Sequence, residues 1–264
     1  SKSLGNGIDP VEVVEKYGAD TLRFMLITGN TPGNDMRFYW ERVESARNFA
    51  NKIWNASRYM LMNLEGFDKD FKPEESDFTL ADKWILSRYA KTAEGVTKSL
   101  DNFELGEAGR MIYEFIWNEF CDWYIELTKA RLYDKENERA KNTALYVLSY
   151  VLEHTLRLLH PFMPFLTEEI WQKVPHDEAF KSIMIADWPA ADEALLDDAA
   201  EAQMTAIMET IKTVRNLRAE VGAAPGHKSE VMLHFTESSL RPVFAENEGY
   251  LKALAAAEPV TLLA

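Results

Sequence analysis

The chain has 264 residues, of which 47% are hydrophobic, and carries a formal net charge of −14. This composition excludes an intrinsically disordered chain and argues against indiscriminate binding to nucleic acids, because phosphate contacts need Lys and Arg. Its single cysteine, Cys121, excludes an intramolecular disulfide, and no apolar run approaches the roughly 20 residues of a membrane helix, so we expect a globular cytoplasmic protein with no metal site.

The first forty residues begin with a phosphate-handling pattern. Residues 1–7 read Ser-Lys-Ser-Leu-Gly-Asn-Gly, which combines small hydroxyls, a mobile positive charge and backbone N–H groups that glycines leave accessible to an anion. Asp9 and Pro10 predict the N-cap and first position of a short helix that ends at Gly18. A second helix is expected over about 19–28, before a stretch of turn residues at 29–35.

A long amphipathic helix is predicted over about 38–64. Phe49, Ile53, Ala56 and Met60 recur at the spacing of one helix face and predict its buried side. The other side carries basic and amide side chains: Arg47, Asn48, Asn51, Lys52, Asn55 and Arg58.

Helical periodicity continues to about Trp171. Thr79-x-x-Asp82 resembles a capping box that opens a helix, and a mostly apolar helix is expected over 101–133. A further core helix around 145–159 is expected to end at His160-Pro161, and a shorter helix follows over 167–174. The short connections predict an antiparallel helix bundle.

The last part of the chain predicts a small α/β segment. An acidic, alanine-rich stretch at 187–202 leads to a helix with core residues from Ile207 to Val221, and strands are expected over 230–235 and 259–263. We therefore expect a mostly α fold with three parts: a linking region (1–40), a helical bundle (41–185), and a linker with the α/β segment (186–264).

Several ordered motifs resemble class I aminoacyl-tRNA synthetases. Residues 1–6 resemble the tail of the Lys-Met-Ser-Lys-Ser signature, and Ile8–Phe24 resembles its continuation in the valyl, isoleucyl and leucyl enzymes. Further stretches look like valyl-tRNA synthetases in particular or recur in the anticodon-binding bundle of that subgroup: 34–38, 46–55, 122–126, 160–165 and 214–218. The resemblance covers nearly the whole chain, and it implies an anticodon-binding helical bundle.

The resemblance also implies an activity for the intact enzyme, which attaches valine to its tRNA with ATP and Mg²⁺. Lys2 matches the second lysine of the signature and would stabilise negative charge on the phosphates, while Ser1 and Ser3 flank it. The nucleotide-binding domain, the editing domain and a C-terminal coiled coil of the family are missing from the sequence. We therefore expect a non-catalytic piece, a monomer without a bound cofactor, whose partners are tRNA(Val) and the missing domains.

The same resemblance makes the anticodon stem-loop the expected ligand of the bundle. Amides and guanidinium groups can read unpaired bases, so we expect the polar face of the 38–64 helix to contact RNA, with Arg37 and Arg42 adding phosphate contacts. A solvated helix surface is the alternative interpretation. Trp117 and Trp123 are interpreted as core aromatics rather than stacking platforms, and Lys212, Arg215 and Arg218 are candidates for the outer body of the tRNA.

Two other functions stay open. An isoleucyl or leucyl relative is disfavoured by residues 34–38. A stand-alone helical scaffold that binds a protein is favoured by the negative net charge of the chain but disfavoured by the Ser-Lys-Ser motif.

Overall fold

The computed structural model describes residues 7–29, 36–224 and 226–263, so the predicted catalytic residues Ser1, Lys2 and Ser3 lie outside it. The helices of the described part are α1 (Pro10–Tyr17), α2 (Ala19–Thr28), α3 (Trp40–Asn63), α4 (Leu80–Asp101), α5 (Leu105–Glu114), α6 (Ile125–Leu132), α7 (Glu138–Leu159), α8 (Pro164–Trp171), α9 (Asp198–Glu220), α10 (Leu240–Glu246) and α11 (Glu248–Ala255). The described part also contains three short 3-10 helices, η2 (Glu75–Asp77), η4 (Ile183–Ile185) and η5 (Glu193–Leu195), and a π-helical segment, η3 (Phe115–Tyr124). Two strands, β1 (Ser229–Leu233) and β2 (Ala257–Leu262), complete the chain, which confirms the mostly α fold class.

The predicted helix caps are present. The Asp9 carboxylate accepts a hydrogen bond from the backbone N–H of Val11 at 2.9 Å, and Gly18 ends α1 with a φ of 89°, a conformation that glycine adopts without strain. Thr79 and Asp82 form both bonds of a capping box at the start of α4. These local signals position α1, α2 and α4 as expected.

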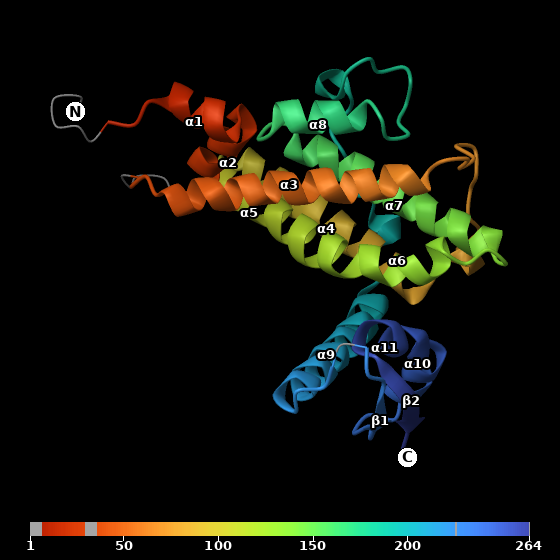
Figure 1. Ribbon diagram of the computed structural model, residues 1–264. Coiled ribbons are helices and arrows are strands. Elements are labelled where there is room, and N and C mark those ends of the chain that lie inside the picture. Colours follow the sequence, from red (N-terminus) through yellow and green to blue (C-terminus); the bar gives the residue numbers. More distant parts are fainter. Residues whose placement is uncertain (1–6, 30–35, 225, 264) are drawn as a thin grey trace.

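Most of the helices before residue 172 pack into one bundle (Figure 1). The helix α3 lies along one side of it and buries Phe49 and Ile53, while α4 and α7 contribute fully buried side chains such as Tyr89 and Leu148. The helix α8 begins three residues before the predicted start, because Pro164 occupies its first turn, where a missing N–H breaks no bond.

The helix predicted over 101–133 is present as one uninterrupted helix over 105–132, but it begins later than predicted and changes geometry along its length. Asp101 is the last residue of α4, and the chain then turns at Phe103, whose φ of 61° is left-handed, before α5 begins at Leu105. From Phe115 the helix widens into the π-helical segment η3 and returns to α geometry at Ile125. The hydrogen bonds of a π-helix run between residues five apart, and Phe115 and Phe120 are both buried at that spacing.

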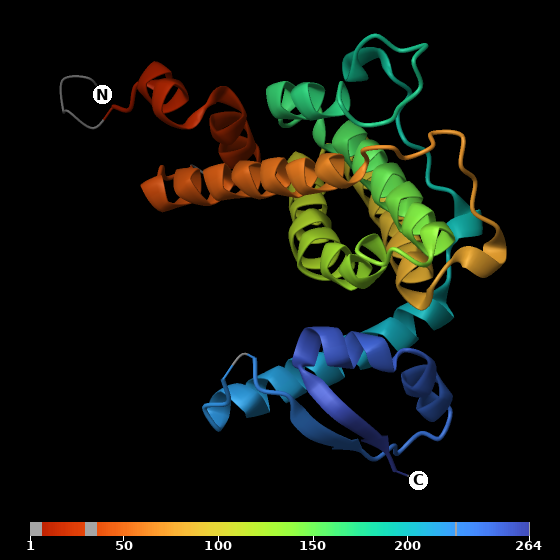
Figure 2. The same cartoon turned by 45° about the vertical axis from the view of Figure 1, so that its right-hand side comes forward.

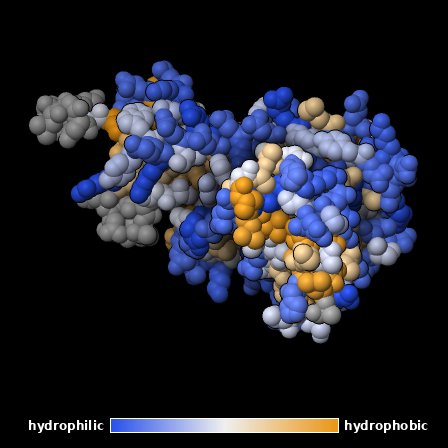
Figure 3. Space-filling view, turned by 60° about the horizontal axis from the view of Figure 1, so that its bottom comes forward, coloured by the Kyte–Doolittle hydropathy of each residue, from blue (hydrophilic) through white to orange (hydrophobic). Residues whose placement is uncertain are grey.

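The helix α9 leads from the bundle to the small C-terminal unit, which Figure 2 shows below the bundle and whose helix α11 contacts α6. There β1 and β2 pair in parallel, with Val231 opposite Val260, and α10 and α11 connect them. Viewed from this end, hydrophobic side chains gather on the surface (Figure 3), and Val221 and Met232 are among the exposed apolar residues. No helix in residues 7–29, 36–224 or 226–263 is long and apolar enough to cross a membrane.

Candidate nucleic-acid interface

The helix α3 separates its apolar and polar residues onto opposite sides. Val43, Phe49 and Ile53 are buried against the bundle. At 3.6 residues per turn, the predicted basic and amide residues from Arg47 to Arg58 fall on the opposite side. Asn48, Asn51, Asn55 and Arg58 are exposed, while Arg47 and Lys52 are half-buried.

A groove follows this polar side, and we call it the α3 groove. It has a volume of about 430 Å³. One wall is α3, with Asn48, Asn51, Lys52, Asn55, Ala56 and Tyr59; the other is formed by η3 and α6, with Cys121, Ile125, Glu126 and Lys129. The fold therefore brings together four of the predicted RNA-contacting residues.

The amides of the α3 groove are available to a ligand. Asn48 has only a long contact, in which Arg47 donates to its Oδ1 at 3.4 Å. Asn51 and Asn55 form no side-chain hydrogen bond with any described residue. Each amide offers two donors and one acceptor oxygen, which is the chemistry needed to pair with the edge of an unpaired base.

Lys52 is held at the edge of the groove by two neighbours on η3. Its ammonium group forms an ion pair with Asp122, and its Nζ lies 4.0 Å from the centre of the Trp117 ring. Trp117 is itself stacked on Tyr113 at 5.5 Å. A cation over an indole face is attracted by the ring, so Lys52 stays in place while half-buried.

The remaining predicted residues occupy other positions. The guanidinium of Arg42 donates to the backbone carbonyl of Gly29 at 2.5 Å and lines a different cleft, of about 1070 Å³, between α2, α3 and α5. Arg47 lies 5.6 Å from the ring of Tyr17. Arg37 and Arg58 are exposed and form no ion pair within the described part of the chain.

The second wall of the groove was not predicted from the sequence. Burial raises the pKa of the Cys121 thiol to about 12, so the thiol is neutral at ordinary pH. Lys129 pairs with Glu126 at 2.6 Å, and its Nζ lies 5.7 Å from the Tyr59 ring. Tyr59 follows Asn55 by about one helical turn, so its spacing alone could have assigned it to the same side of the helix. The η3 and α6 residues, in contrast, are brought here only by tertiary packing.

The comparisons with known proteins define the class of this chain. Residues 82–233 match the family model for the anticodon-binding domain of tRNA ligases, and residues 1–39 match the model for class I tRNA synthetases (I, L, M and V). The chain belongs to the anticodon-binding domain family of the tRNA ligases.

The similar relatives are valine–tRNA ligases. The chain is 56% identical over 260 residues to the valine–tRNA ligase of Carboxydothermus hydrogenoformans, with 98% of the chain and 29% of the relative covered. It is 50% identical over 263 residues to that of Clostridium tetani, with 100% and 29% covered, and 51% identical over 256 residues to that of Bacillus thuringiensis, with 96% and 28% covered. The chain thus spans less than a third of the length of these relatives.

A solved structure shows the same fold. It is the ternary complex of Agrobacterium radiobacter K84 agnB2 LeuRS with tRNA and LeuAMS, which aligns with a TM-score of 0.57 at 23% identity over 75% of this chain and 22% of that one. At this identity the likeness concerns the arrangement of helices alone.

Proposed function

We propose that this chain is the part of a valine–tRNA ligase that holds the anticodon stem-loop of tRNA(Val), with the α3 groove as its contact surface. The observation that carries the proposal is the presence of three exposed amides, Asn48, Asn51 and Asn55, on one wall of a groove. Asparagine is a poor helix former, so three of them on one exposed helix face are better explained by recognition than by helix stability.

The charge of the groove supports an RNA ligand despite the acidic chain. Lys52 and Lys129 line it, and Arg47 and Arg58 lie on the same side of α3. The acids that face these lysines, Asp122 and Glu126, are each in an ion pair with them, so these pairs are close to neutral and the remaining positive charge on this side comes from Arg47 and Arg58. Phosphates can therefore approach while the amides contact the bases.

The activity of the whole protein follows as part of the proposal. The intact ligase activates valine with ATP and Mg²⁺ and transfers it to tRNA(Val), with Lys2, Ser1 and Ser3 near the ATP phosphates. Those three residues lie outside the described structure. We further propose that the protein acts as a cytoplasmic monomer whose other domains carry the catalysis.

A binding assay with altered tRNA tests the proposal. We expect the chain to bind a tRNA transcript with the valine anticodon more tightly than the same transcript with that anticodon replaced. Substitution Asn51→Ala should weaken binding by about fivefold or more, which is the lower end of the range for one lost base contact. Asn102→Ala, an exposed amide at the far end of α4, serves as the control and should bind normally. Equal affinity for the two transcripts would reject the anticodon-binding role, and circular dichroism checks that the variants keep their helices.

A further inference from the structure

A second polar groove lies on the other side of η3, between η3, α4 and α9, and we call it the α9 groove. It has a volume of about 520 Å³. Asn118, Glu119 and Asp122 of η3 and Lys212 of α9 are among its lining residues. None of these residues lines the α3 groove, although Asp122 pairs with Lys52 at its edge, and η3 contributes residues to both grooves.

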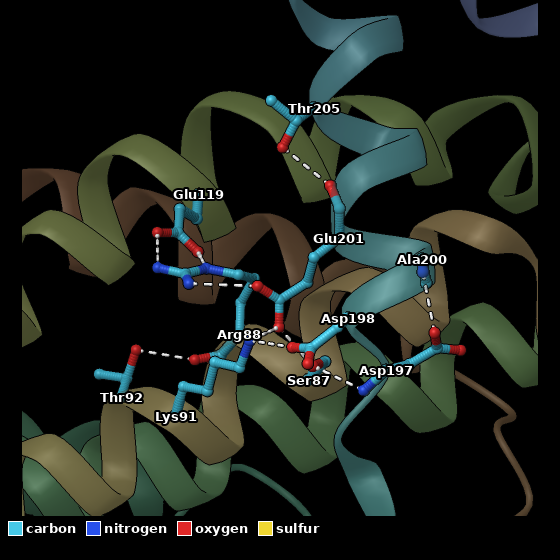
Figure 4. A network of polar contacts seen from close by, with 10 residues as sticks. All are labelled: Ser87, Arg88, Lys91, Thr92, Glu119, Asp197, Asp198, Ala200, Glu201 and Thr205. Carbon is cyan, nitrogen blue, oxygen red and sulfur yellow. Dashed lines mark hydrogen bonds and ion pairs between the residues drawn. The ribbon is translucent and has the colours of Figure 1, made fainter. Parts of the chain in front are cut away.

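The acidic groups in the α9 groove are already neutralised. The Arg88 guanidinium donates two hydrogen bonds to the Glu119 carboxylate, at 2.8 and 2.9 Å, and a longer one to Glu201 at 3.4 Å. Lys91 pairs with Glu201 at 2.9 Å and with Asp198 at 2.5 Å (Figure 4). This network fixes α9 against α4 and η3, so the groove is a preorganised surface rather than a gap between mobile parts.

Two side chains at the groove remain available to a ligand. The Asn118 amide is exposed and forms no side-chain hydrogen bond with the described residues. The Lys212 Nζ lies 5.6 Å from the centre of the Trp123 ring, and its ammonium has no acidic partner in residues 7–29, 36–224 and 226–263. Arg215 lies over the same ring at 5.8 Å, outside the lining of the groove, and its Nε donates to the backbone carbonyl of Leu254 at 2.6 Å, which leaves its two terminal NH₂ groups to reach toward a phosphate. The amide can hydrogen-bond to the edge of a base, and the cations beside it can contact a phosphate. Both groups belong to one nucleotide, so the combination suits a single-nucleotide ligand.

The ridge between the grooves connects the two sites. Cys121 faces the α3 groove, whereas Asn118 and Asp122 line the α9 groove, and the ion pair between Lys52 and Asp122 spans from one to the other. A helix is about 10–12 Å across with its side chains. A single strand whose bases are splayed apart can cross such a ridge and place bases on both sides.

We propose that the α9 groove is a second nucleotide site, which takes an unpaired nucleotide of the same RNA loop that occupies the α3 groove. Asn118 contacts the base, and Lys212 with Arg215 contacts the adjoining phosphate. This proposal rests on the proposed function of the α3 groove. It makes α9 part of the RNA-binding surface rather than a connector to the C-terminal unit alone.

A cycle of protein and RNA changes tests this second site. The probe is a synthetic anticodon stem-loop hairpin of tRNA(Val), prepared with an abasic residue at each loop position in turn, and the readout is fluorescence anisotropy with the full 264-residue chain. We expect Asn118→Ala to weaken binding by about fivefold and to abolish the effect of the abasic residue at one position. Asn51→Ala should abolish the effect at a different position. Lys212→Ala should reduce the slope of log K against log [salt] by about 1, while the control Lys181→Ala, an exposed lysine in the connection between α8 and η4, leaves it unchanged.

The possible results separate the two proposals. If Asn51→Ala weakens binding but Asn118→Ala and Lys212→Ala bind as tightly as the original chain, the second site is refuted and the α3 groove stands. If no variant changes the affinity for the hairpin, the α3 groove is refuted as well. Asn118 and Lys212 are exposed, so unchanged circular dichroism is expected for both variants.

Discussion

Removal of the Asp122 carboxylate is predicted to tighten RNA binding. The substitution Asp122→Asn keeps the shape of the side chain but deletes the negative charge that pairs with Lys52. The Asp122 side chain is 47% exposed, so its field acts through a largely aqueous medium. Lys52 stays near the groove after the change, because its Nζ remains over the Trp117 ring.

Two estimates of the effect agree. In water, two unit charges about 4 Å apart interact with about 1 kcal/mol, so the loss of repulsion between Asp122 and a neighbouring phosphate amounts to at most about that. A lysine freed to neutralise one phosphate of a single strand adds about 0.7 to the salt slope, which at 0.1 M salt also corresponds to about 1 kcal/mol. We therefore expect about fivefold tighter binding at 0.1 M salt.

The assay is fluorescence anisotropy with the tRNA(Val) transcript over a series of KCl concentrations. The matched control is Glu178→Gln, which deletes the same charge from another exposed pair, with Lys69 at 3.5 Å, in the loop after α8. The control should change affinity far less, because it alters only the distant field of the protein. Weaker binding by Asp122→Asn, or an unchanged salt slope, refutes the placement of RNA phosphates beside Lys52.

Three further predictions concern stability and reactivity. Asp82→Ala should lower the free energy of unfolding, measured in urea, by about 3–5 kcal/mol. The fully buried Asp82 carboxylate accepts two hydrogen bonds from Arg131, both at 2.7 Å, and its loss leaves the Arg131 guanidinium unpaired. The control Glu169→Ala removes one partner of an exposed pair and should cost no more than about 0.5 kcal/mol. Burial raises the pKa of the Glu201 carboxyl, but the hydrogen bonds that it accepts lower the pKa by more, so the net pKa lies below the ordinary value of 4.5. The Glu201 carboxylate therefore stabilises the fold above pH 4.5, and this stabilisation is lost as the pH falls below that value. The protection of the α9 amides against hydrogen exchange, relative to the intrinsic rate at each pH, should therefore fall below pH 4.5, and this loss of protection should be absent in Glu201→Gln. The Cys121 thiol, with its pKa raised to about 12, should react with iodoacetamide at pH 8 far more slowly than a free thiol, and bound tRNA should slow it again; a fast reaction would contradict the burial of this wall.

The fold was predictable wherever a local signal decides the structure. Asp9 with Pro10, and Thr79 with Asp82, form the caps that their residue types favour. The π-helical segment η3 was not predictable, because it is apolar on most sides and periodicity cannot then distinguish bonds four apart from bonds five apart. The two short helices α10 and α11 carry no strong pattern of their own and depend on packing against α9 and the strands.

The candidate site was predictable on one wall only. Helical periodicity places the amides of α3 on one face, and Asn51 and Asn55 lie on that exposed face in the structure, although no pattern predicted the groove beside them. The same periodicity separates Arg42 from them, since Arg42 and Asn51 are nine residues, or about two and a half turns, apart and so point to opposite sides. The opposite wall, with Cys121 and Lys129, depends on how η3 and α6 pack beside α3, which no local pattern encodes.

The acidity of the chain and its proposed RNA ligand are compatible because of how the charges are arranged. Lys52 and Lys129 at the α3 groove are each paired with an acid, so phosphate binding must compete with an existing ion pair and gains little from counterion release. The three neutral amides, in contrast, form hydrogen bonds whose strength depends little on the net charge of the protein, and these hydrogen bonds discriminate between bases. Such a surface binds an arbitrary phosphate backbone weakly and depends on contacts to particular bases. Its affinity should therefore vary more with loop sequence than with salt, which is the behaviour that a domain selecting one anticodon requires.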